Sequence, residues 1–206
     1  MDPIHLILPG ENDYFTAEAY KVLRTNLQFC GQDVRVIAFT NCLADEGKTT
    51  VALHTSRSFA QLGEKVLFLD TDMRKSVIAD RNTDIQNARG LSEVLRGLCS
   101  FEESVYPVED LPLDVLPAGQ FPPNPVELLS GRHFSDLMAM CRSRYDYIIV
   151  DTPPLGEVID AAVVARHCDG MALVIGSKKV RCRHAQDVIE QIRKSGCRIL
   201  GAVRNG

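Results

Sequence analysis

A glycine, a lysine and a threonine stand together where the chain passes from an apolar segment into a helical pattern. The sequence there is CLADEGKTT, residues 42–50. Gly47 leaves backbone N–H groups open to an anion, Lys48 can reach the β- and γ-phosphates of a nucleotide, and the Thr49 hydroxyl can bind Mg²⁺. Cys42 stands where the G-x-x-x-x-G-K-[ST] pattern has its first glycine. The position between a strand and a helix therefore predicts a phosphate-binding loop more strongly than the three residues do alone.

Carboxylates follow two further apolar segments. The sequence LFLDTDMR places Asp70 and Asp72 at the end of one segment, and YIIVDTPP places Asp151 at the end of another. The carboxyl ends of parallel strands meet at the sheet edge where α/β proteins bind ligands, so these side chains should lie beside the loop. Mg²⁺ takes a few hard oxygens together with phosphate and water. The sequence therefore predicts a magnesium site at this edge.

Segments rich in valine, isoleucine and leucine alternate with helical patterns, and these elements must position the polar side chains. The expected strands are 34–40, 66–69, 148–150, 172–175 and 199–203, and the expected helices are 15–29, 48–62, 91–98, 125–141, 160–167 and 185–194. Asn124 is expected to cap the helix that Pro125 begins. Strands that are apolar throughout indicate a mainly parallel sheet with helices on both faces. The predicted fold is α/β, doubly wound and like that of the P-loop NTPases.

The composition is that of a globular chain, and we expect a single domain over 1–206 with a helical segment, 1–33, before a nucleotide-binding core, 34–206. With 45% hydrophobic residues and a net charge of -4, the composition excludes a disordered chain. No apolar run approaches the roughly 20 residues that cross a bilayer. The first residues lack the basic and apolar regions of a secretory signal.

Cysteine and charge patterns limit the compartment and the partners. The seven cysteines are odd in number and include no Cys-x-x-Cys pair, which argues against a disulfide framework or a zinc site and for a reducing cytoplasm. From Ser177 onward eight Lys and Arg accompany two Asp and Glu. This basic stretch is either a solvated surface or a patch near bound phosphate or the anionic inner leaflet. Because the chain is acidic and lacks interleaved aromatics, no nucleic-acid partner is expected.

The sequence resembles the bacterial tyrosine kinases of capsule and exopolysaccharide synthesis, in particular the stand-alone cytoplasmic form of Gram-positive bacteria. The similar segments are 18–26 (EAYKVLRTN), 70–74 (DTDMR), 116–129, 145–154 and 159–162 (IDAA). The resemblance implies an ATP- and Mg²⁺-dependent protein-tyrosine kinase, an autokinase that regulates polysaccharide polymerisation and export. It also implies a transmembrane adaptor with an activating cytoplasmic tail, a cognate tyrosine phosphatase and a homo-oligomeric ring. The expected location is the cytoplasm, at the inner face of the membrane through that adaptor.

The resemblance also implies roles for individual residues. The implied nucleotide-binding residues are Asp45, Glu46, Gly47, Lys48, Thr49, Thr50 and Asn205. The implied Mg²⁺ ligands are Thr49, Asp70 and Asp151, and the implied catalytic residues are Lys48, Asp70 and Asp72. Lys48 is expected to face solvent and phosphate. One of Asp70 and Asp72 should accept the tyrosine proton, but both are expected on one strand face, so spacing does not separate them. The Asn205 amide offers the donor and the acceptor that an adenine edge requires.

Three charged residues of the first helix match a family motif, Glu-x-x-Arg-x-x-Arg, that is used in ring-like oligomers. They are Glu18, Lys21 and Arg24, and Lys21 replaces the first arginine of the motif. Their spacing of three places them near one helix face, from which they could bridge to a neighbouring subunit. A solvated charge cluster within the helix explains the spacing equally well.

The chain departs from the family pattern at two places. Ala44-Asp45 replaces the usual Pro-Gly, and Asp45 should weaken nucleotide binding unless its side chain points to solvent. The five tyrosines include no C-terminal cluster of the family's kind. One alternative is a non-kinase switch ATPase of the partition and division-site class, but Leu43 stands where that class has a signature lysine. The other is a weakly active regulatory scaffold for a membrane partner.

Overall fold

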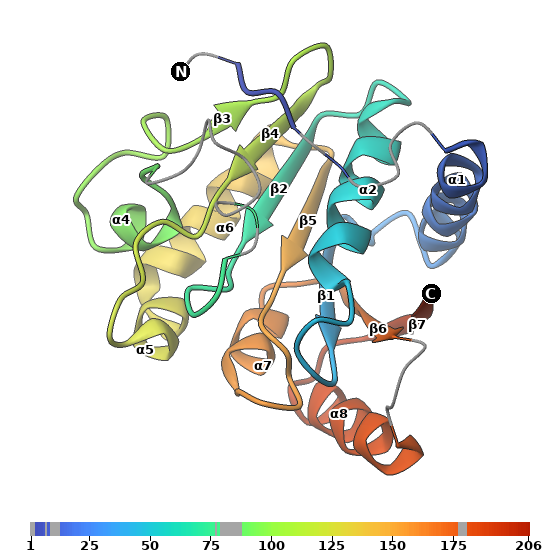
Figure 1. Cartoon of the computed structure of the whole chain (residues 1–206). Helices are drawn as coiled ribbons and strands as arrows, with labels where there is room; N and C mark the ends of the chain where they lie inside the picture. Colours follow the sequence, from blue (N-terminus) through green and yellow to red (C-terminus); the bar gives the residue numbers. More distant parts are fainter. Residues whose placement is uncertain (1–2, 7, 9–12, 77, 79–87, 177–180) are drawn as a thin grey trace.

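One mixed sheet organises the computed structural model, which describes residues 1–206 except 1–2, 7, 9–12, 77, 79–87 and 177–180 (Figure 1). Within that part, its strands are β1 (Val36–Asn41), β2 (Val66–Asp70), β3 (Tyr106–Pro107), β4 (Leu113–Leu116), β5 (Tyr147–Asp151), β6 (Gly170–Gly176) and β7 (Ile199–Asn205). The strand order is β3-β4-β2-β5-β1-β6-β7. Neighbouring strands are parallel except β3 and β4, which are antiparallel.

Helices cover both faces of this sheet (Figure 1). They are α1 (Tyr14–Phe29), α2 (Lys48–Ala60), α4 (Leu91–Leu95), α5 (Pro125–Ser130), α6 (Arg132–Arg144), α7 (Asp160–Ala165) and α8 (Cys182–Lys194). Helix α2 packs on one face with α1 outside it, and α4 to α8 lie on the opposite side. The expected doubly wound α/β fold is confirmed.

The strands are apolar throughout because each contributes to two cores. In β1, Val36 and Ala38 belong to the core under α4 to α8, whereas Ile37 and Phe39 belong to the core under α2. Successive side chains of a strand point to opposite faces, so a strand covered on both faces has no polar side. Burying one such side chain fully stabilises the fold by about 1.5–3 kcal/mol.

The segment from β3 to α6 differs from the sequence expectation. The expected helix over 125–141 is two helices, because Gly131 between α5 and α6 has extended backbone with φ -76° and ψ 162°. Pro125 is the first helical residue as expected, but the Asn124 side chain makes no capping hydrogen bond. Strands β3 and β4 were not expected, since both are too short for a clear apolar pattern.

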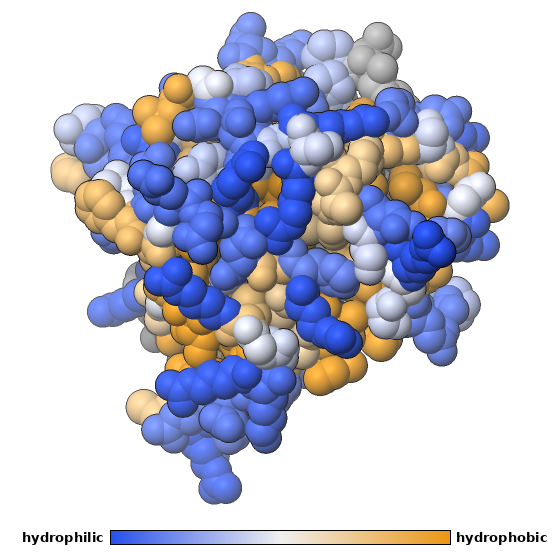
Figure 2. All heavy atoms as spheres, turned by 180° about the vertical axis from the view of Figure 1, so that it is seen from behind, coloured by the Kyte–Doolittle hydropathy of each residue, from blue (hydrophilic) through white to orange (hydrophobic). Residues whose placement is uncertain are grey.

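The segment before α1 covers the β3 edge of the sheet. The Ile4 N–H donates to the Pro107 carbonyl at 2.8 Å, and Ile4, Leu6 and Leu8 are buried. Covering an edge strand in this way satisfies backbone groups that would otherwise pair with other chains. Within the described residues, no helix is long and apolar enough to cross a membrane. Hydrophilic side chains dominate the rear face, and apolar residues show between them (Figure 2).

Candidate active site

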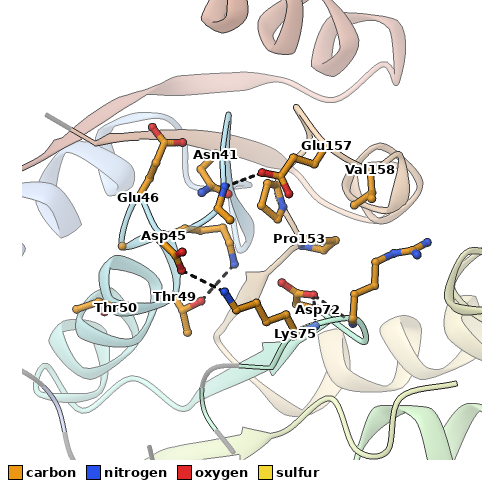
Figure 3. A pocket seen from close by; sticks show the side chains of 15 residues that line it. Asn41, Asp45, Glu46, Thr49, Thr50, Asp72, Lys75, Pro153, Glu157 and Val158 are labelled. Atoms are coloured by element: carbon orange, nitrogen blue, oxygen red, sulfur yellow. Dashed lines mark hydrogen bonds and ion pairs between the residues drawn. The ribbon is translucent and has the colours of Figure 1, made fainter. Parts of the chain in front are cut away.

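A cavity of about 250 Å³ opens where β1, β2 and β5 end. Its lining residues come from the loop after β1, the turn after β2 and the turn after β5; they include Asn41, Asp45, Glu46, Lys48, Thr49, Thr50, Asp72, Arg74, Lys75, Pro153, Glu157 and Val158 (Figure 3). Asp70 and Asp151 are register partners on adjacent parallel strands. The predicted loop and all three carboxylates therefore lie at one edge of the sheet, although they are far apart in the sequence.

The loop from Cys42 to Gly47 enters α2 through a position that requires glycine. Gly47 has φ +79°, and a Cβ there would collide with the side-chain amide of Asn205. Lys48 is the first residue of α2, so the N–H groups of its first turn face the cavity end of the helix. This arrangement can bind a phosphate.

Lys48 lies inside the protein, and the expectation that it faces solvent is wrong. Its side chain is only 5% exposed, and its ammonium contacts Asp151 Oδ1 and lies 3.3 Å from Thr49 Oγ1. The Thr49 hydroxyl donates to Asp151 Oδ2 at 2.7 Å. Since a buried charge is costly without a partner, Asp151 balances Lys48 in this state.

Asp70 and Asp72 occupy different environments, so the expectation that they share a strand face is also wrong. Strand β2 ends at Asp70, which is fully buried and accepts hydrogen bonds from the Asp72 N–H at 2.9 Å and the Ser76 hydroxyl at 2.7 Å. Burial, and then the charge of Asp151, raises the pKa of Asp70 to about 8. Asp72 lies beyond the strand and lines the cavity, and burial raises its pKa as well. The turn itself holds Asp72 in place, because its Oδ1 accepts the N–H of Lys75 at 3.0 Å.

Two carboxylates bind backbone N–H groups of the loop. Glu46 Oε2 accepts the N–H groups of Cys42 and Leu43 at 2.9 and 2.8 Å, and its Oε1 accepts that of Gly176, at the end of β6, at 3.0 Å. Glu157, in the turn after β5, accepts the Ala44 N–H at 2.9 Å (Figure 3). The Glu46 side chain thus fixes the loop to the sheet. Sequence reasoning assigned no role to Glu157, whose contact depends on a turn more than a hundred residues from the loop.

The Asp45 side chain lies at the exposed rim of the cavity, across from Lys75. It is 81% exposed and lies 3.3 Å from the Lys75 ammonium (Figure 3). Asp45 has φ +63°, a left-handed backbone conformation that glycine adopts without strain. This conformation explains why glycine suits the position. Because the Asp45 carboxylate is exposed to solvent, we expect it to repel a bound triphosphate only weakly.

Asn205 lies against the loop. Its Nδ2 donates to the Glu46 carbonyl at 2.9 Å. With Thr50 it lines a second cavity, of about 450 Å³, between α1, α2 and the end of β7. The role of Asn205 in adenine recognition stays a prediction, since one donor of its amide is used by the loop.

The residues expected at an oligomer interface lie outside the active site, and they do not form one outward face. Lys21 pairs with Glu18 at 2.7 Å within α1. Arg24 points inward and donates to the Ser58 carbonyl at 2.6 Å and to its hydroxyl at 3.2 Å. Arg24 therefore connects α1 to α2 of the same chain, and the interface role of these three residues stays a prediction.

A bidentate ion pair missed by sequence reasoning fixes the turn after β2. Arg74 Nε and Nη2 lie 2.8 and 3.1 Å from the carboxylate of Asp160, which is fully buried at the start of α7. This contact raises the pKa of the Arg74 guanidinium. The pair holds Arg74 on the cavity wall and joins the turn carrying Asp72 to α7.

The donors at the cavity fit Mg²⁺ bound together with a nucleotide. Thr49, Asp70, Asp72 and Asp151 offer hard oxygens, and the buried Oδ1 of Asn41 has no hydrogen-bond partner among the described residues. No group of three or more His, Cys, Asp or Glu side chains in the described part of the chain is arranged to hold a metal by itself. Mg²⁺ commonly relies on one or two carboxylates and completes its shell with phosphate and water.

Comparison with known proteins identifies the family. The profile of a family described as an AAA domain matches residues 34–195. The chain is 35% identical over 190 residues to the tyrosine-protein kinase CpsD of Streptococcus agalactiae, covering 92% of this chain and 83% of that protein. It is 35% identical over 204 residues to the tyrosine-protein kinase YwqD of Bacillus subtilis, covering 98% and 86%. The kinase domain of the Escherichia coli tyrosine kinase ETK superposes with a TM-score of 0.87 at 33% identity, covering 92% of this chain and 75% of that one. The chain belongs to the bacterial protein-tyrosine kinases.

Proposed function

We propose that this protein transfers the γ-phosphoryl group of ATP to tyrosine residues of proteins. The observation that carries the proposal is the meeting of Lys48, Thr49, Asp151 and Asp72 at one cavity, in a chain of this family. A phosphate loop and strand-end carboxylates at the same sheet edge are what phosphoryl transfer requires.

The roles follow from burial and position. The N–H groups at the start of α2 bind the phosphates, and Asn205 and Thr50 flank the base. Thr49, Asp70 and Asp151 hold Mg²⁺, which supplies positive charge to the phosphate oxygens. Lys48, already beside Asp151, compensates the charge that develops on the transferred group.

Asp72 is the proton acceptor in this proposal, because it lines the cavity while Asp70 is fully buried. The tyrosine oxygen forms a bond to the γ-phosphorus as the bond from that phosphorus to the β-bridging oxygen breaks. ADP leaves with the electron pair, and the phenol proton passes to the Asp72 carboxylate. A raised pKa suits this carboxylate to accept a proton.

The cellular role extends the same proposal. The kinase regulates capsular or exopolysaccharide polymerisation and export and is opposed by a cognate tyrosine phosphatase. A transmembrane adaptor recruits it to the inner face of the membrane and activates it through a cytoplasmic tail. The kinase assembles into a homo-oligomeric ring, to which Glu18, Lys21 and Arg24 contribute contacts between copies. In the single chain Arg24 binds Ser58, so its part in the ring would require a second partner or an exchange of this bond.

The experiment is transfer of label from radioactive ATP to a polymer of glutamate and tyrosine, with Lys48→Met as the inactive variant. Removing one charge-stabilising group from an active site commonly lowers kcat by about 10²–10³-fold. Lys194→Met, at the exposed end of α8, is the matched control and should keep full activity. Equal transfer by Lys48→Met and the unmodified chain would contradict the proposal. Circular dichroism of both variants checks that each remains folded.

A further inference from the structure

Tyr14 differs from the other tyrosines of this chain. All five lie in described residues, and Tyr14 is 70% exposed at the first position of α1. Its hydroxyl makes no hydrogen bond to any described residue, and its ring meets only the edge of Phe15, at 5.8 Å. Asp13 caps the helix beside it by accepting the Thr16 N–H at 2.9 Å, so the backbone at Tyr14 is ordered while its side chain faces solvent.

The four remaining tyrosines are buried or half-buried. Tyr145 is buried and donates to Asp114 at 2.7 Å, and Tyr106 is buried in β3. Tyr147 lies in β5 with its ring 4.1 Å from that of Phe59, and Tyr20 stacks on His54 at 4.5 Å. Tyr20 and Tyr147 are half-buried, so Tyr14 is the one of the five tyrosines whose side chain is exposed.

The active site receives a long side chain from outside. The Asp72 carboxylate is nearly buried at the base of the cavity, so an acceptor hydroxyl must extend inward past the rim formed by Arg74, Lys75 and Val158. The exposed Tyr14 side chain can extend in this way, whereas Tyr106 and Tyr147 have their rings packed in the fold. Asp13 next to Tyr14 gives the acceptor segment a negative charge that suits Lys75 on the rim, whose pair with Asp45 is exposed and exchangeable, whereas Arg74 is held by Asp160.

The geometry excludes Tyr14 of the same chain as the acceptor for its own Asp72. No residue of α1 lines the cavity at Asp72, whereas four residues of α1 line the separate cavity beside Thr50 and Asn205. Helix α1 is fixed there by the bonds from Arg24 to Ser58 and by the stacking of Tyr20 on His54.

We propose that Tyr14 is an autophosphorylation site that a second copy of this chain phosphorylates. The inference rests on the proposed kinase function. The Tyr14 oxygen forms the bond to the γ-phosphorus of ATP held by the other copy, ADP leaves with the bridging oxygen and its electron pair, and the phenol proton passes to Asp72 of that copy.

The experiment uses the full chain with ATP and Mg²⁺, and mass spectrometry locates the phosphate. We expect the phosphate on Tyr14. The Tyr14→Phe variant should lose self-labelling, whereas the matched control Tyr147→Phe should keep it. Tyr14→Phe should also phosphorylate a tagged, inactive Asp72→Asn or Lys48→Met chain, which shows transfer between copies. Two inactive recipients guard against misfolding of either one.

The outcomes separate the two proposals. If Tyr14→Phe self-labels as strongly as the unmodified chain while both phosphorylate the glutamate–tyrosine polymer, the inference about Tyr14 is wrong and the kinase function stands. If the unmodified chain phosphorylates neither itself nor the polymer, both proposals fail.

Discussion

Helices α1 and α2 pack against each other yet have opposite surroundings. Eleven of the thirteen residues of α2 are buried, whereas α1 buries only Leu27 among sixteen. Helix α2 lies between the sheet and α1, and the loop before it is fixed by Glu46, Glu157 and Asn205. Helix α1 is attached along one side, and Phe15, Val22 and Phe29 are exposed on the other.

This difference indicates which changes should reach the nucleotide site and which should not. Changes in α2 or its loop should alter the nucleotide site and the stability of the fold together, because the same contacts serve both. Changes on the outer side of α1 should leave ATP binding intact. The following predictions test that separation.

Asp151→Ala should have the largest effect. It leaves the Lys48 ammonium buried without its partner, which costs about 3–5 kcal/mol of unfolding free energy. Asp45→Asn is the control, because it removes the exposed Asp45–Lys75 pair with a residue that tolerates the left-handed backbone, and such a pair contributes about 0–1 kcal/mol. Urea unfolding of the nucleotide-free proteins measures both. Equal losses of unfolding free energy in the two variants would contradict the prediction, because the buried and the exposed ion pair would then contribute equally to stability.

Glu46→Ala should weaken ATP binding although the carboxylate does not point at the phosphate position. It removes three hydrogen bonds from loop and β6 N–H groups. Hydrogen bonds to a charged group contribute about 1.5–3 kcal/mol, so a loss of about tenfold or more in affinity is expected. Calorimetric titration with ATP and Mg²⁺ measures it. The ATP affinity of Glu46→Gln should lie between those of the unmodified chain and Glu46→Ala, since the glutamine side chain keeps one acceptor oxygen. Unchanged affinity in Glu46→Ala would mean that the loop keeps its shape without this residue.

Arg24→Ala should destabilise the protein without changing ATP affinity. Loss of the bonds to Ser58 should cost about 1–3 kcal/mol, whereas Lys21→Ala on the outer side should cost about 0.3–0.5 kcal/mol, as for an exposed helix pair. Thermal unfolding and calorimetry compare the variants. If Lys21→Ala reduces the size of the oligomer while the unfolding temperature stays unchanged, Lys21 belongs to the interface between copies.

The part of the site predicted correctly from the sequence depends on strand ends. Asp70 and Asp151 follow apolar strands, and parallel topology alone brings such ends together. Gly47 and the start of α2 were predictable for the same reason. The remaining contacts depend on side chains that could have turned either way. Lys48 binds Asp151 instead of facing solvent, and Arg24 turns inward to Ser58. The spacing of residues along the chain predicts neither orientation.

The fold shows the same division. Long apolar strands such as β1 were predicted because burial on both faces leaves a clear pattern. The two-residue β3 leaves none, and its pairing with β4 is set by a register that no local sequence determines. The break at Gly131 was missed because α5 and α6 together read as one amphipathic pattern, and only the extended backbone at the glycine separates them.

The smallest effect is expected from Asp45→Gly alone, which restores the glycine usual in the family at this position. Ala44→Pro is left out because it would remove the N–H that Glu157 accepts. The Asp45 carboxylate is exposed and lies near Lys75, so salt screens most of its repulsion of a triphosphate. Glycine would remove the strain of φ +63°, but it also increases the entropy of the unfolded chain. These two effects on the free energy of unfolding oppose each other, so stability should change little. Because salt screens this charge, the affinity for ATP should change by less than about threefold at 0.15 M salt. At low salt, where screening is weaker, the variant should bind ATP slightly more tightly than the unmodified chain. Calorimetric titrations at the two salt concentrations decide it, with Asp45→Asn to remove charge alone. A tenfold gain at physiological salt would instead indicate that the Asp45 carboxylate acts directly on the bound phosphates.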